Sequence, residues 1–243
     1  MRRAGGVLRH APRKSEPMVT PSPSDANGRR LWLAPAITGA LTALALAAVY
    51  LVTVSRAGGA LDADALVALG AKVDPEVAAG QWWRLVTSVF LHAGGMHLAL
   101  NAIWLALFTA GAAALIGPAR AVATGLLGGV AGQLLSFAVS MGPSVGASGA
   151  VFALAGTLLA VVWRRRERLA PDVRWRLLAS LGAATAALLF FPLTAGAVDH
   201  AAHVGGFVAG AALGALPERR IATAALCIAA VGISALALLS ANS

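Results

Sequence analysis

The stretch MHLALNAIWLALFTAGAAALI, residues 96–116, has no Asp, Glu, Lys or Arg and is as long as one membrane span. A helix needs about 20 mostly apolar residues to cross a bilayer. The whole chain of 243 residues has the same character, because 58% of its residues are hydrophobic and only 12% are charged. Soluble domains carry roughly 25% charged residues. The sequence therefore predicts an all-α, polytopic membrane protein.

Similar apolar runs lie on both sides of this stretch. Clusters of glycine, proline or arginine separate them and mark the connections between helices. The pattern predicts a bundle of six membrane helices followed by one additional C-terminal helix. The predicted spans cover residues 31–55, 96–116, 120–140, 148–163, 177–195, 198–216 and 221–240.

The remaining segments give the domain organisation. Residues 1–30 are basic and rich in Pro, Ser and Gly, which predicts a disordered cytoplasmic tail because this composition cannot bury a core. A signal peptide is the alternative, but the apolar run that follows is longer than a typical signal sequence. We expect residues 31–216 to form the membrane core, with residues 57–84 as its first external loop, and residues 217–243 to form the additional transmembrane helix.

The positive charges predict the orientation. The formal net charge is +9, but the positive residues lie between apolar runs, which argues against a nucleic-acid partner. Seven Lys or Arg in the tail, six Arg between residues 164 and 176, and Arg219 with Arg220 fall on one side of a seven-span chain. Positive residues favour the cytoplasmic side. We therefore expect a plasma-membrane protein with its N-terminus inside and its C-terminus outside; binding of anionic lipid head groups is a second interpretation of the arginines.

Polar residues inside membrane spans are candidates for function, because they are costly in hydrocarbon. The predicted second, fourth and sixth spans all begin at the outer side, so polar residues near their starts share one depth. A serine, histidines and an asparagine on three helices could supply a nucleophile, its base and an oxyanion hole. Gln133 in the third span is an isolated exception. The others are His92, His97, Asn101, Ser148, Asp199, His200 and His203.

Ser148 is the candidate nucleophile. Gly146 and Gly149 on either side of it remove side-chain bulk and allow a substrate backbone to approach. A helix N-terminus at Ser148 would also direct backbone N–H groups toward an oxyanion. The alternative is that Ser148 only caps its helix.

His97 and Asn101 are four residues apart, so they share one helical face, and both can donate hydrogen bonds when neutral. The alternative is that they hold neighbouring helices together. His92 is separated from them by Gly94 and Gly95, where we expect the helix to break, so His92 is predicted to lie in the loop.

Three ordered motifs resemble the signature regions of the rhomboid intramembrane proteases. The Trp83-Arg84 pair in the first loop is similar to a further motif of that family, and the resemblance covers about residues 80 to 215. The three motifs are Gly146-x-Ser148-Gly149, His92-x4-His97-x3-Asn101, and Ala202-His203-x2-Gly206-x3-Gly210.

The resemblance implies a rhomboid-like six-helix core and a serine endopeptidase with a Ser148–His203 dyad and no carboxylate. His97, Asn101 and the Ser148 backbone N–H would form the oxyanion hole. The implied substrates are single-pass membrane proteins in the bilayer, cut near the extracytoplasmic side of their spans, and no metal or organic cofactor is implied. Phe152 departs from the family pattern, because many members have a tyrosine there that packs on the catalytic histidine.

His203, rather than His200, is the predicted base. Gly206, Gly210 and Gly214 follow it on one helical face, and Gly149, Ala153 and Gly156 form a matching surface beside Ser148. His200 would then lie nearer the outer surface, in contact with water. Asp199 could act as a triad acid, but a capping carboxylate is the favoured interpretation.

Two other functions remain as alternatives. A non-proteolytic relative that escorts membrane segments would lack the serine or the histidine, and both are present. A transporter would need polar residues along a pathway through the membrane, whereas here they gather near one surface. Cys227 is the only cysteine, so an intrachain disulfide is excluded.

Overall fold

The computed structural model describes residues 26–59, 61–140, 142–190 and 198–217, and all regular structure among them is helical. The predicted seventh helix and Cys227 lie outside these residues, as do residues 1–25 of the predicted tail. The long helices are α1 (Ala26–Arg56), α5 (Gly95–Ile116), α6 (Pro118–Val139), α7 (Ser148–Arg164), α8 (Pro171–Phe190) and α9 (His200–Ala215).

The long helices follow the predicted core spans closely, with two differences at their starts. α1 begins at Ala26 and α8 at Pro171, five and six residues before the predicted starts at 31 and 177. A helix bonds its own backbone and so extends past the apolar stretch into polar residues. Among the described residues, length and composition suit Trp32–Arg56, Gly95–Ile116 and Pro118–Val139 for crossing a membrane, while α7 is apolar but shorter.

The turns between these helices follow from local chemistry. Gly94 precedes α5, as expected from the break predicted at Gly94 and Gly95. Gly117 has a φ of 90°, a left-handed conformation that favours glycine, and it joins α5 directly to α6. Pro118 then opens α6, where its missing N–H costs nothing.

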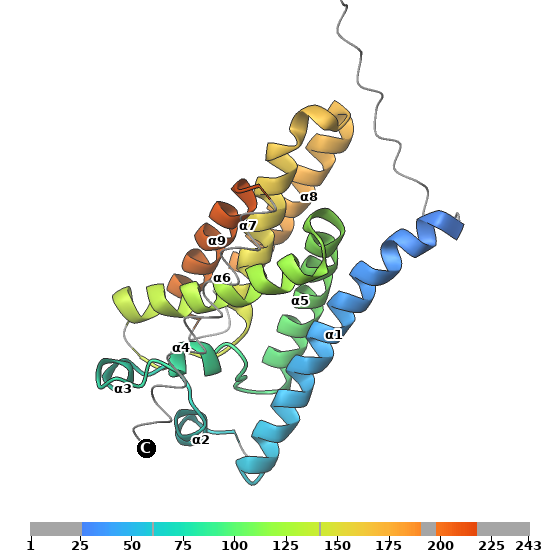
Figure 1. Ribbon diagram of the computed structural model, residues 1–243. Helices are drawn as coiled ribbons and strands as arrows, with labels where there is room; N and C mark the ends of the chain where they lie inside the picture. Colours follow the sequence, from blue (N-terminus) through green and yellow to red (C-terminus); the bar gives the residue numbers. More distant parts are fainter. Residues whose placement is uncertain (1–25, 60, 141, 191–197, 218–243) are drawn as a thin grey trace, which may run out of the picture.

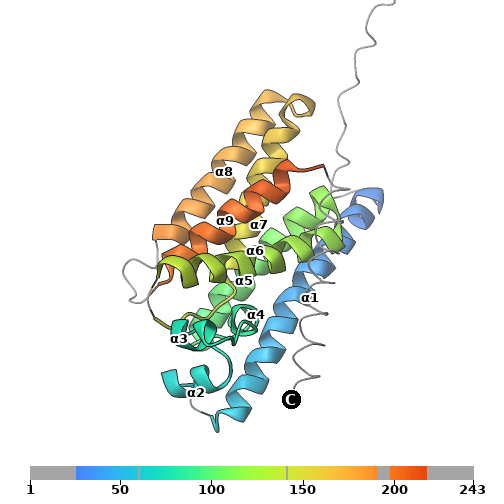
Figure 2. The ribbon, with the colours of Figure 1, turned by 60° about the vertical axis from the view of Figure 1, so that its left-hand side comes forward.

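Helix α7 lies at the centre of the bundle. It packs against α9, α6, α5 and α8, whereas α1 packs mainly against α5 (Figures 1 and 2). Leu154 and Leu158 of α7 lie in the main hydrophobic core with Phe108 and Ala112 of α5. The surroundings of α7 are therefore mostly protein, which suits a helix shorter than a full span.

Three short helices that were not predicted lie in the first loop, residues 57–84, and just after it. They gather at one end of the bundle, opposite the turn that joins α7 to α8 (Figures 1 and 2). Buried Arg84 fixes this loop, because its guanidinium donates to the Val67 carbonyl at 2.7 Å and the Ala71 carbonyl at 3.0 Å. The short helices are α2 (Ala63–Ala68), α3 (Asp74–Ala78) and α4 (Arg84–Thr87); a one-turn 3-10 helix, Arg166–Arg168, follows α7.

The interface between α7 and α9 consists of backbone packed on backbone. A Cβ atom added to Gly206 would overlap the Gly149 carbonyl, and one added to Gly210 would overlap the Ala153 carbonyl. One added to Gly214 would come within 2.7 Å of the Thr157 carbonyl oxygen. Small residues allow such close approach between membrane helices. The predicted glycine stripe thus lies against the surface beside Ser148.

We predict that Gly210→Ala lowers the thermal unfolding midpoint, because the new methyl group must push α9 away from Ala153. Overpacking of this kind costs about 1–3 kcal/mol. Gly182→Ala on α8 is the matched control, because a Cβ there meets no atom within 4 Å. It should leave the midpoint unchanged or raise it slightly, because replacing a glycine inside a helix with alanine adds at most about 1 kcal/mol to the free energy of unfolding. Equal midpoints for the two variants in detergent would contradict this account of the interface.

Candidate active site

Ser148 and His203 meet where α7 and α9 begin. Ser148 is the first residue of α7 and His203 lies in the first turn of α9. His203 Nε2 lies 2.8 Å from Ser148 Oγ, which is hydrogen-bonding distance. The hydroxyl does not cap its own helix, since the N-cap of α7 is Ala147 and no side-chain capping bond forms there. The capping interpretation of Ser148 is therefore not supported.

The ring of Phe152 orients the imidazole of His203. The two rings stack with centroids 4.4 Å apart and planes at 23°, and both side chains are buried. Phe152 lies one helical turn after Ser148, so α7 provides both the hydroxyl and the ring surface. His203 Nδ1 is buried and has no hydrogen-bond partner among the described residues. Among the described residues, Ser148 and His203 thus form a pair without a third, orienting carboxylate.

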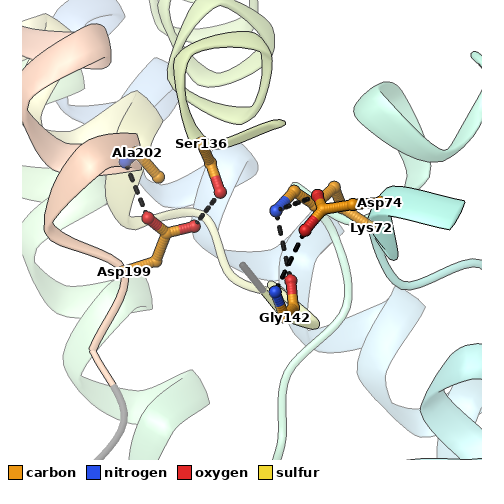
Figure 3. A network of polar contacts seen from close by, with 6 residues as sticks. All are labelled: Lys72, Asp74, Ser136, Gly142, Asp199 and Ala202. Atoms are coloured by element: carbon orange, nitrogen blue, oxygen red, sulfur yellow. Dashed lines mark hydrogen bonds and ion pairs between the residues drawn. The ribbon is translucent and has the colours of Figure 1, made fainter. Parts of the chain in front are cut away.

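The Asp199 carboxylate caps α9 and makes no hydrogen bond to the His203 ring among the described residues. Its Oδ1 accepts the Ala202 N–H at 3.0 Å, and its Oδ2 accepts the hydroxyl of Ser136 on α6 (Figure 3). The cap was the favoured interpretation of Asp199, whereas the bond to Ser136 was not predicted. This carboxylate ties the start of α9 to the end of α6, beside His203.

His97 and Asn101 lie together against the segment that precedes Ser148. Asn101 Nδ2 donates to the His97 carbonyl at 2.9 Å. Gly146 has a φ of 127°, and a Cβ added to it would come within 2.8 Å of His97 Nε2. Only a glycine fits there without moving the ring. His97 of α5 therefore lies directly beside Gly146, and the Asn101 amide lies 3.9 Å from the same Cβ position.

His92 supports the same segment from the loop before α5. The side chain is fully buried, and burial, with a smaller contribution from nearby His97, lowers the pKa of His92 to about 4. The ring is thus neutral at physiological pH. The Phe90 carbonyl, 3.1 Å away, can only accept, so Nδ1 carries the proton and Nε2 accepts the Ala147 N–H over a long 3.5 Å. Sequence reasoning placed His92 in the loop but missed this contact.

The two remaining predicted polar residues, His200 and Gln133, differ in how much of each side chain is exposed. His200 is half-buried, and its ring meets His203 edge-on with centroids 5.9 Å apart. Gln133 on α6 is buried, and its Oε1 has no hydrogen-bond partner among the described residues. His200 is thus an alternative base close to His203.

Comparison with known proteins agrees with this architecture. Residues 79–220, more than half of the chain, match the family model described as the Rhomboid domain. The matched region runs from the end of the first loop through α9 and contains every predicted site residue. The sequence resemblance is therefore found again by an independent comparison.

Several curated proteins are similar to the chain. Rhomboid protease GluP of Bacillus subtilis is 35% identical over 210 residues, which are 82% of this chain and 40% of that protein. Rhomboid protease AarA of Providencia stuartii is 29% identical over 72% of this chain and 70% of its own length. Rhomboid-like protease 3 of Toxoplasma gondii is 34% identical over 61% of this chain and 56% of its own length.

The chain thus spans less than two thirds of the Bacillus and Toxoplasma relatives that it matches. The helical architecture, its apolar candidate spans and the domain match agree with one another. The chain belongs to the rhomboid family of polytopic helical membrane proteins.

Proposed function

We propose that the chain is an intramembrane serine endopeptidase in which Ser148 is the nucleophile and His203 its general base. The observation that carries the proposal is the 2.8 Å contact between His203 Nε2 and Ser148 Oγ, at the end of the bundle where α7 and α9 begin. A hydroxyl within hydrogen-bond reach of an imidazole is the arrangement that activates a serine. The relatives named as rhomboid proteases support the same reaction class.

The reaction would be acyl transfer through a covalent intermediate. His203 Nε2 takes the proton from Ser148 as Oγ attacks the substrate carbonyl carbon, and the new N–H then protonates the leaving amine. Water hydrolyses the acyl-enzyme with His203 again as base. Without a carboxylate on Nδ1, the stacked ring of Phe152 is what holds the imidazole in place.

The oxyanion would be stabilised by donors around Gly146. The backbone N–H of Ser148 lies in the first turn of α7, where N–H groups have no acceptor within their own helix. The positive end of the helix dipole points the same way. His97 and Asn101, packed beside Gly146, would supply the side-chain donors.

The proposed substrates are single-pass membrane proteins, cut near the extracytoplasmic side of their spans. The site lies where α5, α7 and α9 begin, next to the first loop. The turn between α7 and α8, at the opposite end, carries Arg164, Arg165, Arg166 and Arg168. The positive-inside rule assigns that end to the cytoplasm, which supports an outward-facing site in the plasma membrane.

We expect Ser148→Ala and His203→Ala each to abolish cleavage of a single-span substrate in liposomes. Both variants should still unfold in one cooperative thermal transition. Ser148→Ala should keep the wild-type midpoint, because it removes a single oxygen atom, while His203→Ala should have a lower midpoint, because it loses the ring contact with Phe152. A serine-directed fluorophosphonate should label the wild type and leave Ser148→Ala unlabelled. Wild-type labelling of the Ser148→Ala protein would refute the nucleophile.

For the oxyanion donors we expect His97→Ala or Asn101→Ala to lower kcat about 10²- to 10³-fold, because one donor is lost while others remain. KM should change little, since these donors act on the charge that develops in the transition state. Steady-state cleavage kinetics separate the two effects. A KM that rises as much as kcat falls would identify the residue as a substrate contact instead.

His200 provides the matched control for the base. His200→Ala should keep substantial activity under conditions where His203→Ala has none, because only His203 contacts the serine hydroxyl. The two rings are neighbours, so any general effect of losing an imidazole at this end should appear in both variants. The reverse ranking in a cleavage assay would refute this assignment of the dyad.

A further inference from the structure

The loop before the nucleophile is bonded along its length to other elements. We call residues 142–147 the nucleophile loop. Ser144 pairs with Lys72 of the first loop through two backbone hydrogen bonds of 3.1 and 2.9 Å. Further along, the Gly146 N–H donates to the Ser88 carbonyl at 2.9 Å. Lys72 in the first loop and Ser88 just after it thus bond to residues that lie 72 and 58 positions later in the chain.

An ion pair holds the far end of the nucleophile loop. Lys72 Nζ lies 2.7 Å from Asp74 Oδ1 and donates to the Gly142 carbonyl at 3.1 Å (Figure 3). Asp74 Oδ2 accepts the Gly142 N–H at 3.0 Å. The pair therefore binds both backbone polar groups of Gly142, its N–H and its carbonyl.

The burial of this pair sets it apart from ordinary loop charges. Lys72 is completely buried and the Asp74 side chain is 19% exposed. Removing charges from water is costly, and an apolar pair of similar volume is often as stable. A gain in folding stability therefore explains this buried pair poorly. The pair is better explained by its hydrogen bonds, which hold Gly142 in one fixed orientation.

The nucleophile loop needs such an external restraint. Gly142 and Gly146 have φ values of 115° and 127°, in the region that glycine enters freely. Ser148 follows directly, so any movement of the loop changes the position of its hydroxyl and of the N–H groups of the first turn. A shift of about 1 Å in a reacting group can cost 10²-fold in rate.

We propose that Lys72 and Asp74 are positioning residues, whose ion pair clamps the nucleophile loop and so aligns Ser148 with His203. This inference rests on the proposed endopeptidase function. The ion pair acts on catalysis by holding the N–H and the carbonyl of Gly142, next to the backbone pairing of Lys72 with Ser144. It does not contact the substrate.

The test compares Lys72→Met, Asp74→Ala and the double variant in liposomes. Each should lower kcat and the rate of fluorophosphonate labelling of Ser148 about ten- to a hundredfold, with KM within about twofold. The single variants leave one buried charge without its partner, so their unfolding midpoints should fall. The double variant should regain much of the midpoint yet remain slow, because Gly142 has lost both partners.

Asp62→Ala is the matched control, because Asp62 is also a first-loop carboxylate. It caps α2 by accepting the Ala65 N–H at 2.8 Å. Its variant should keep the wild-type kcat. Hydrogen exchange of residues 142–147 should be faster in the Lys72 and Asp74 variants and unchanged in Asp62→Ala.

Two outcomes overturn different claims. If kcat returns to the wild-type value together with the midpoint in the double variant, the pair is only structural and the clamp proposal fails while the protease stands. If the wild type itself neither cleaves nor becomes labelled, the proposed function fails, and faster exchange in the variants would then identify the pair as a structural clamp alone. All kinetic comparisons are made well below the lowest unfolding midpoint.

Discussion

The backbone contact between α7 and α9 is the constraint on which the rest of the molecule depends. Gly206 and Gly210 place α9 directly on the carbonyl groups of Gly149 and Ala153. Apolar side chains gain little free energy when they move from lipid into contact with protein, so close van der Waals packing must supply the free energy of helix association. On its other side α9 meets α6, where a Cβ at Gly132 would overlap the Ala202 carbonyl. The start of α9 is therefore fixed from two directions.

This fixed start would align the proposed dyad of Ser148 and His203. The His203 ring receives its orientation from the stacked Phe152 and from a helix that Asp199 caps and bonds to Ser136. The segment before Ser148 is held by His92, in the loop before α5, and by the backbone pairing of Ser144 with Lys72 in the first loop. The proposed catalytic residues thus lie at the starts of packed helices, and polar bonds hold the loops between them.

The sequence predicted the parts that depend on periodicity and motif. The bounds of α5, α6 and α7, the loop position of His92 and the glycine stripe of α9 all appear in the structure. Two features were not predicted, namely the short helices around the first loop and the bonds that join Lys72 to Gly142 and Ser136 to Asp199. Helices of four to six residues show no periodicity. The bonds from Lys72 to Gly142 and from Ser136 to Asp199 join residues 70 and 63 positions apart, which no local pattern encodes.

The central place of α7 has a consequence for biosynthesis. Most of its residues are buried, yet its principal neighbour, α9, emerges from the ribosome only after α8 has been made. Until then the surface beside Ser148 lacks its α9 partner, and the proposed base, His203, has not been made. A nascent or truncated chain that ends before His203 is therefore expected to be inactive, so the proposed hydrolysis could begin only once α9 has packed on α7.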